Sequence, residues 1–171
     1  DLYLGATIIK WHIDGASDPA KTRWAMSAEG YIKLSLKDVE GYLEGVGRKL
    51  PSKASAPFSS TSYRPELDDS PLLTDSQASY YQGLIGVLRW CIELGRVDIL
   101  FEVTVLSSFL AAPRAGHLEQ VFHIFAYLKH YLRLHLVLDD TEPNLSKYEF
   151  TKCNWSEIYF GAQEPVPKDT P

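Results

Sequence analysis

Residues 81–129 read YQGLIGVLRWCIELGRVDILFEVTVLSSFLAAPRAGHLEQVFHIFAYLK. Apolar residues recur in this stretch at intervals of three and four, which places them on one face of an α-helix. Gly95 and residues 113–116 interrupt the pattern, and glycine and proline are residues at which helices end. Three consecutive helices are therefore predicted, with these core positions: Tyr81, Leu84, Ile85, Leu88, Cys91 and Ile92; Ile99, Val103, Leu106 and Leu110; Leu118, Val121, Phe122, Phe125 and Leu128.

The ends of these helices carry charges that suit them. Asp98 lies at the start of the second helix, where a carboxylate is favoured by the positive end of the helix dipole. Lys129, His130 and Arg133 lie at the end of the third, where cations are favoured. The stretch holds no arrangement of nucleophile, base or metal ligands. We therefore expect it to be a scaffold or a contact surface.

A β-hairpin and one further helix are predicted before this stretch. Residues 2–9 and 22–26 have strand-like composition, and residues 14–21 between them are rich in turn-forming types. Ser27 suits a helix N-cap because its hydroxyl can accept from a free amide of the first turn. The helix that follows ends near Gly47, and its predicted apolar face consists of Tyr31, Leu34, Val39, Tyr42, Leu43 and Val46.

Two polar segments complete the predicted chain. Residues 51–75 are rich in Ser, Pro, Thr and Asp and form a connection of a length that is unusual inside a domain, typical of a surface strap or a partner contact. Residues 134–138 alternate as a short strand does, and an acidic linker begins at Asp139, with one short amphipathic helix predicted over 153–164. The predicted fold class is α+β, mainly α, with a β-hairpin, one amphipathic helix, a long polar loop, a three-helix unit, a short strand and an acidic linker.

We divide the chain into four predicted segments: a hairpin and first helix at 1–50, a loop at 51–75, a helical unit at 76–138 and a linker at 139–171. The chain begins at Asp1 directly in strand-like sequence, which we expect of a piece of a longer protein. No apolar run reaches the roughly 18 residues of a membrane span, so no membrane contact is expected. Cys91 and Cys153 belong to no metal-binding pattern, and buried thiols are expected.

The net charge of −5 is unevenly distributed along the sequence. Residues 136–171 carry seven acidic and three basic side chains, whereas residues 76–135 carry four acidic and five basic ones. A protein that binds nucleic acid by itself usually has a strongly basic field. This chain lacks one, so any contact with nucleic acid is expected to occur beside a more basic neighbour.

Acidic doublets at 68–69 and 139–140 raise the hypothesis of a two-magnesium site. Such a site needs a third carboxylate on a neighbouring strand, and none is visible, so the polar end of a strand is the preferred interpretation of Asp139 and Asp140. His117, His123 and His130 lack the spacing of a helical metal pair. No metal, cofactor or catalytic residue is predicted within the chain.

Five cations on the helical unit are candidates for phosphate contacts. They could line one side of the three helices and supply affinity that does not depend on sequence. A merely solvated face is the alternative. The five are Arg89, Arg96, Arg114, Lys129 and Arg133.

The order of these motifs resembles one region of copia-type LTR-retrotransposon reverse transcriptases, the thumb and connection that follow the polymerase active site. The resemblance covers about residues 2–138 and is most specific over 80–130. The matching positions are Tyr3, Leu4, Gly5 and Ile8; Tyr81, Leu84, Ile85, Gly86, Leu88 and Trp90; Arg96, Asp98 and Ile99; Pro113; and His117, Ile124, Tyr127, Leu128 and Lys129.

The resemblance implies a non-catalytic part of an RNA-directed DNA polymerase that holds a primer–template duplex. Tyr3, Leu4 and Gly5 fall at the primer grip of that family, and Leu84, Gly86, Asp98, His117 and Tyr127 fall at its structural motif positions. The magnesium-binding polymerase palm and the ribonuclease H domain would be flanking partners, and magnesium is expected only there. The isolated chain is expected to be inactive. The expected location is intracellular, in cytoplasmic virus-like particles or the nucleus.

Two other hypotheses remain open at this stage. One is a non-catalytic helical interaction domain derived from a retroelement. The other is an unrelated metal enzyme that uses Asp139 and Asp140.

Overall fold

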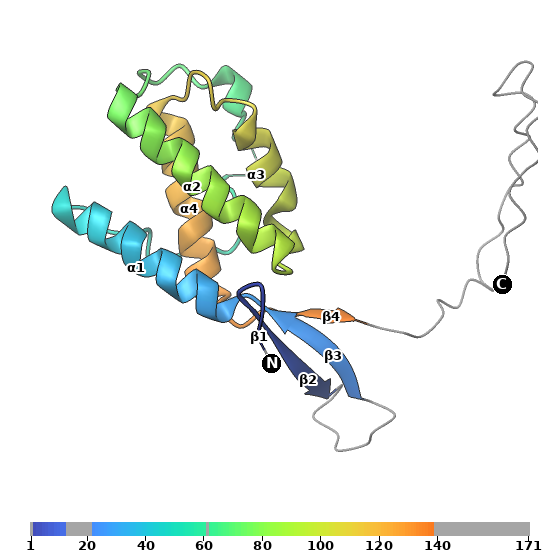
Figure 1. Ribbon diagram of the computed structural model, residues 1–171. Helices are drawn as coiled ribbons and strands as arrows, with labels where there is room; N and C mark the ends of the chain where they lie inside the picture. The colour runs from blue at the N-terminus through green and yellow to red at the C-terminus, as the bar shows by residue number, and fades with distance from the viewer. Residues whose placement is uncertain (1, 13–21, 61, 139–171) are drawn as a thin grey trace, which may run out of the picture. The chain divides into compact units, whose positions relative to one another are not determined.

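The computed structural model describes residues 2–12, 22–60 and 62–138 (Figure 1). In these residues α1 (Glu29–Gly45) packs with the helices of the predicted helical unit, and a small antiparallel sheet lies beside them. This confirms the predicted α+β, mainly α, fold class. The elements run in the order β1 Leu2–Tyr3, β2 Ala6–His12, β3 Thr22–Ser27, α1 Glu29–Gly45, η3 Pro65–Leu67, α2 Asp75–Glu93, η4 Val97–Ile99, α3 Leu100–Ser107, α4 Ala115–His130 and β4 Leu136–Leu138.

Helix α4 is the centre of the core. It contacts α1, α2 and α3, and Figure 1 shows it behind α2 with α1 and α3 on either side. Because it is surrounded, α4 buries residues all around its circumference rather than along one stripe, as expected of a central helix. The core positions predicted for the three helices are confirmed as buried or packed against the core.

Helix α1 packs through one narrow stripe at the edge of the unit. The stripe consists of Ile32, Leu36, Val39 and Leu43, which follow at intervals of four, three and four. The predicted apolar face of this helix was wrong at two positions, Leu34 and Val46, whose side chains are exposed. It also omitted Ile32 and Leu36, which are buried. An edge helix meets its neighbours on one side only, so the face that is buried depends on its rotation against α4.

The sheet has strand order β1-β2-β3-β4, and every neighbouring pair is antiparallel. The strand predicted at 2–9 is wrong in one respect, because the chain reverses at Leu4 and Gly5 and divides it into β1 and β2. Strand β4 confirms the short strand predicted near 134–138 and pairs with β3. The predicted tip of the hairpin, residues 14–21, lies outside the described residues, as do the predicted linker and its short helix.

Glycines in the left-handed conformation end two of the helices. Gly47 has φ +69° and follows α1, and Gly95 has φ +102° and follows α2. At each end two backbone amides donate back to the last turn, the arrangement of a Schellman motif. At Gly95 an added Cβ would lie 3.0 Å from the Cβ of Leu136, so this glycine also allows β4 to pass closely over the end of α2.

The long loop predicted at 51–75 is a strap over α4. The Ser59 amide donates to Gln120 Oε1 at 3.1 Å, and Gln120 Nε2 donates back to Ser59 Oγ at 2.8 Å. Farther along, the Ser70 hydroxyl accepts from the Gly116 amide at 2.8 Å, and the Ser70 carbonyl accepts from Arg114. These bonds satisfy polar groups of an otherwise irregular segment, which is why a loop of this length stays on the surface of the core.

Candidate nucleic-acid interface

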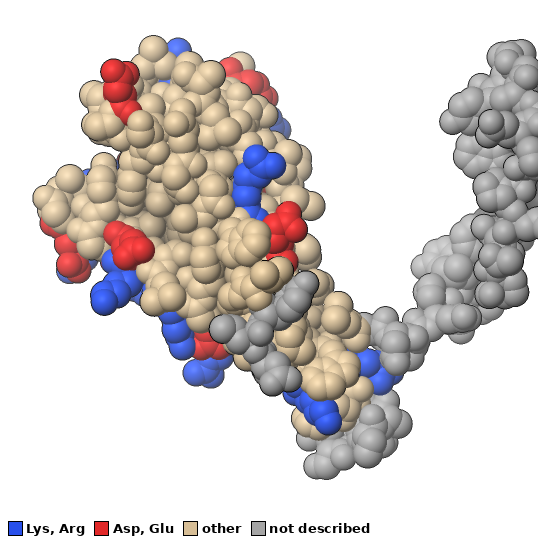
Figure 2. Space-filling view, viewed as in Figure 1, with Lys and Arg blue, Asp and Glu red and all other residues tan. Residues whose placement is uncertain are grey.

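The sheet is a positively charged part of an acidic chain. Its described strand residues include Lys10 and Arg23 but no aspartate or glutamate. Figure 1 shows β2 and β3 extending away from the helices, and Figure 2 shows blue but no red atoms on this described extension. Trp11 and Trp24 are 41% and 52% exposed there. Cations beside exposed aromatic rings are the combination with which proteins bind nucleic acid without sequence preference.

The two tryptophans lie on opposite faces of the sheet. Lys10 is paired with Trp24, and Trp11 is paired with Arg23, one residue along. Because paired residues share a face and successive residues alternate, Lys10 and Trp24 share one face, while Trp11 and Arg23 share the other. The Lys10 ammonium lies 5.5 Å from the centre of the Trp24 ring, and β4 adds Leu138 opposite Trp24.

The predicted primer-grip positions form the turn between β1 and β2. Leu4 has φ +50° and Gly5 has φ +100°, so both central residues of this two-residue turn are left-handed. A Cβ at Gly5 would lie 3.6 Å from Leu94 and 3.9 Å from Trp90 Nε1. The turn therefore rests on the end of α2 with Leu4 exposed to solvent. It is a backbone reversal that joins β1 to β2 and lies against the end of α2.

Arg96 is buried, and its assignment to a phosphate-binding surface is therefore wrong. Its side chain is 2% exposed, and it donates from Nε and Nη2 to the two oxygens of Asp98 at 2.9 and 2.7 Å. Its guanidinium also lies 5.8 Å from the centre of the Tyr127 ring. Burial raises the pKa of Asp98, but the hydrogen bonds and charge of Arg96 and a hydrogen bond from Tyr127 outweigh it, and the net pKa is lowered.

The other four predicted cations are not gathered on one surface. Arg114 donates to the strap, and Lys129 pairs with Glu40 at 2.6 Å between α1 and α4. Arg89 lines a small hollow between α2 and α3, and Arg133 follows α4 and is exposed. Their contact with nucleic acid stays a prediction, but the structure does not place them together as one phosphate-binding row.

Besides Asp98 and Tyr127, which contact Arg96 and each other, two more family-motif positions have a visible structural role. His117 is buried; its Nδ1 accepts from the Arg114 amide at 3.1 Å, and its Nε2 lies 3.0 Å from the Pro65 carbonyl, so it joins the start of α4 to the strap. Leu84 is a core residue. Gly86 differs, because an added Cβ would have no described neighbour within 4 Å beyond its own helix backbone. No packing requirement for glycine is visible at that position.

Asp68, the first residue of the acidic doublet at 68–69, has a structural role in the strap. Asp68 accepts from the Tyr63 hydroxyl at 2.8 Å and from the Ser70 amide at 3.0 Å. Burial raises the pKa of Asp68, but hydrogen bonds from the Ser70 hydroxyl, the Tyr63 hydroxyl and the Ser70 amide outweigh it, and the net pKa is lowered. A Cβ at Gly116 would clash with this carboxylate, which explains the glycine at the start of α4.

The described residues form neither a metal cluster nor a membrane-spanning helix. They contain no group of three or more His, Cys, Asp or Glu side chains placed to hold a metal ion. Within the same part of the chain, no helix has the length and apolarity to cross a membrane. Asp139, Asp140 and Cys153 lie outside it, while Cys91 is buried, as predicted, and burial raises its pKa to about 12.

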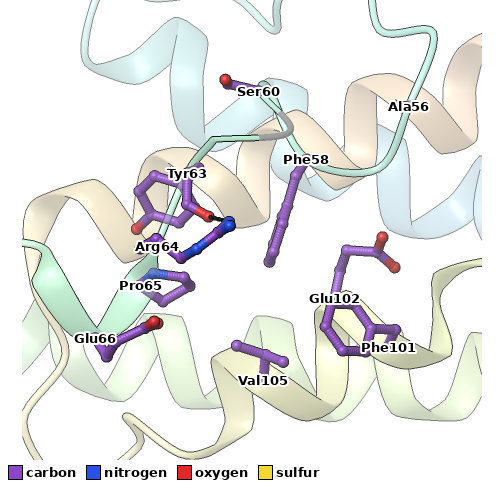
Figure 3. A pocket seen from close by; sticks show the side chains of 10 residues that line it. All are labelled: Ala56, Phe58, Ser60, Tyr63, Arg64, Pro65, Glu66, Phe101, Glu102 and Val105. Carbon is purple, nitrogen blue, oxygen red and sulfur yellow. Dashed lines mark hydrogen bonds between the residues drawn. The ribbon is translucent and has the colours of Figure 1, made fainter.

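An apolar hollow of about 620 Å³ lies between the strap and α3 (Figure 3). Phe58 and Tyr63 from the strap pack edge to face with ring centres 5.6 Å apart. Phe101 and Val105 of α3 face them across the hollow, and Glu102 lies at its rim. Phe101 is 68% exposed, which is unusual for so large an apolar side chain.

One comparison with known proteins bears on identity. The sequence is 33% identical over 107 residues to the protein named "Putative transposon Ty5-1 protein YCL074W" of Saccharomyces cerevisiae. The chain is related to a retrotransposon protein. The match covers 60% of this chain and 32% of the yeast protein, so the chain spans about a third of that relative. No protein-family model matches the sequence, and no solved structure gives a significant match.

Sequence reasoning missed the aromatic and basic surface of the sheet. The signal was present in the alternation of IIKWH and TRW, which puts Lys10 and Trp24 on solvent-facing positions of two strands. It also missed the capping box of α2, in which Thr74 and Gln77 bond reciprocally. The T-x-x-Q pattern before an apolar run was the readable sign of it.

Proposed function

We propose that this retrotransposon-related chain is the non-catalytic part of a copia-type reverse transcriptase that holds the primer–template duplex. The order of its motifs and its similarity to a yeast transposon protein support this proposal. The polymerase palm and the ribonuclease H domain would be its neighbours in the longer protein, inside the cell. Magnesium would belong to those neighbours, as the resemblance implies.

The observation that carries the proposal is the charge and chemistry of the sheet. In a chain of net charge −5, the described strands carry cations and no carboxylate, and they expose two indole rings. Phosphates are attracted to the cations, and the turn at Leu4 and Gly5 lies against the end of α2. A surface of this kind positions a nucleic-acid backbone without performing chemistry on it.

Binding of a fluorescent DNA–RNA duplex to the purified chain tests the proposal. Lys10→Glu should weaken binding several-fold, because it reverses one charge on the sheet. The matched control is Lys53→Glu, an identical change of net charge at an exposed position on the strap. Equal effects of the two variants, or no duplex binding by the unaltered chain, would contradict the proposal. No nucleotide incorporation with magnesium is expected from either.

A retroelement-derived interaction domain is the second candidate function. The observation that favours it is the exposed Phe101 beside the hollow between the strap and α3, because exposed aromatic side chains over apolar hollows are typical of protein contacts. Phe101→Asp should leave duplex binding unchanged if the sheet is the interface. A chain that fails to bind duplex but assembles with another protein, and loses that assembly in Phe101→Asp, would establish this second function instead.

A further inference from the structure

We infer that Trp24 and Lys10 form a stacking site for an unpaired nucleotide, at the edge of the duplex that the chain holds. This inference rests on the proposed function and specifies its ligand. The site is the face of the sheet that carries Lys10, Trp24 and Leu138.

This face of the sheet lies next to the C-terminal end of α2. Its inner residues, Met26 and Leu136, lie against Gly95 at the end of α2: an added Cβ there would be 3.4 Å from Met26 Cε and 3.0 Å from Leu136 Cβ. Its outer residues, Lys10 and Trp24, lie beyond the end of that helix and are exposed. The indole of Trp24 is therefore held on a supported strand but is open to solvent.

The contact that Trp24 makes within the chain can be exchanged. Lys10 Nζ lies 5.5 Å from the centre of the indole ring, a cation–π contact. At an exposed site a cation–π contact changes an equilibrium constant by about two- to fivefold. A base stacked on an aromatic ring changes the binding constant by about 5- to 150-fold. A base can therefore displace the flexible lysine, whose ammonium is then free to pair with the adjacent phosphate.

The chemistry of the ring selects an unpaired nucleotide rather than a paired one. Within a duplex both faces of each base are covered by the neighbouring base pairs. Only an unpaired or terminal base offers a free face to an indole. Among the described residues, the charged group that lies against the ring is the Lys10 ammonium, and the described strands contain no carboxylate.

Trp11, on the opposite face, is the less suitable of the two exposed rings. It packs edge to face against His135, with ring centres 5.1 Å apart and planes at 73°. His135 comes from the segment before β4 and is only partly exposed, so it cannot move aside as a lysine can. Trp11 therefore serves as a matched control on the same hairpin.

The test compares binding of a blunt duplex with binding of the same duplex carrying a single-stranded overhang of several thymidines. We expect the overhang to raise affinity at least fivefold for the unaltered chain. The readout is the ratio of overhang affinity to blunt-duplex affinity, taken for each variant. Trp24→Ala should bring this ratio to about one, whereas Trp24→Phe should retain part of the gain and Trp11→Ala all of it. Quenching of tryptophan fluorescence by oligothymidylate should be weaker in Trp24→Phe, which reports stacking even if Trp24→Ala folds poorly.

Several results would overturn the inference. One is that the overhang does not raise the affinity of the unaltered chain. Another is that it still raises the affinity of folded Trp24→Ala, and a third is that Trp11→Ala loses the overhang effect as fully as Trp24→Ala does. Failure to bind the blunt duplex would instead contradict the proposed function. In that case a Trp24-dependent affinity for oligothymidylate alone would still support the stacking site.

Discussion

The Arg96–Asp98 pair shows how one buried cation organises the joint between α2 and α3. The Arg96 amide donates to the Cys91 carbonyl at 3.0 Å, which closes the end of α2, and its side chain then reaches Asp98 in η4. Arg96 Nη1 is buried without a hydrogen-bond partner among the described groups. Asp98 therefore accepts the side-chain hydrogen bonds that offset the cost of burying the Arg96 guanidinium.

Asp98→Ala should destabilise the protein by about 3 kcal/mol, because it leaves a buried guanidinium without its carboxylate. Chemical denaturation followed by circular dichroism measures this. Glu93→Ala is the control, since that exposed carboxylate has no such partner among the described interactions. A loss below about 1 kcal/mol in Asp98→Ala would show that the pair is solvated.

The lowered pKa of Asp98 also predicts a pH dependence. The folded state binds the proton of this carboxyl less readily than the unfolded state, whose pKa is about 4. Its contribution to stability is therefore present above about pH 4 and is lost as the pH falls through the lower folded pKa. Between pH 5 and pH 2 the free energy of unfolding should fall more steeply for the unaltered chain than for Asp98→Asn. Parallel curves would contradict this.

Gly86 and Gly95, which lie nine residues apart, differ in backbone conformation. Gly95 is left-handed and closely approached by Leu136, whereas Gly86 lies inside α2 with no described neighbour near an added Cβ. Gly95→Ala should destabilise the protein by about 1–3 kcal/mol. Gly86→Ala should stabilise it by up to about 1 kcal/mol, because alanine is the better helix former. Thermal unfolding of both variants gives the comparison, and changes of the same sign would be inconsistent with it.

At the scale of the element, the difference between α4 and α1 is one of surroundings. Helix α4 is enclosed by three helices and the strap, so residues on every side of it are buried. Helix α1 lies at the edge and buries one stripe. Helix α4 is also the more apolar of the two, as a helix with neighbours on every side must be.

Phe125→Asp in α4 should unfold the domain, because an unpaired carboxylate in the core costs several kcal/mol. Leu34→Asp in α1 should change the stability by less than about 0.5 kcal/mol, because Leu34 faces solvent. Circular dichroism and a melting curve distinguish the two. Cooperative folding of Phe125→Asp would refute the central position of α4.

The strap is a second element whose order depends on α4. His117 connects the start of α4 with Pro65, and Gln120 holds Ser59. His117→Ala should destabilise the protein by about 2 kcal/mol, since it leaves the Arg114 amide without its acceptor. Limited proteolysis should then cleave faster within residues 51–74. An unchanged cleavage pattern would show that the strap is held independently of His117.

At the scale of the whole molecule, the distribution of charge matters more than its sum. The described strands carry cations only, while α1 carries both signs, as Figure 2 shows along its outer edge. Lys129 and Arg48 are already paired with Glu40 and Glu119. On the described strands the cations that could contact phosphates are Lys10 and Arg23.

This distribution predicts weak duplex binding with a modest salt dependence. With about two phosphate contacts, affinity should fall roughly tenfold between 50 and 200 mM salt. A titration by fluorescence anisotropy at several salt concentrations gives the slope. A loss of a thousandfold or more over that range would indicate a phosphate-binding surface larger than the sheet.

The periodicity of residues 81–129 was sufficient to predict three helices, their joints and nearly all of their core positions. That was possible because helix faces and glycine ends depend on neighbours within a few residues. The rotation of α1 was not predictable in the same way, since Leu34 and Ile32 are equally apolar and only packing against α4 distinguishes them. Arg96 is a similar case, because an arginine near a helix end is exposed far more often than buried.

Local sequence alone thus determined the mainly helical fold, the hairpin, and the motifs that relate this chain to retrotransposon proteins. Tertiary structure alone decided that β4 completes the sheet, that Arg96 is buried, and that Lys10 and Trp24 share an exposed face beside the end of α2. The physical reason is the range of the interactions. Helix periodicity and capping act over a few residues, whereas strand pairing, burial and the surroundings of a charge depend on residues distant in the sequence.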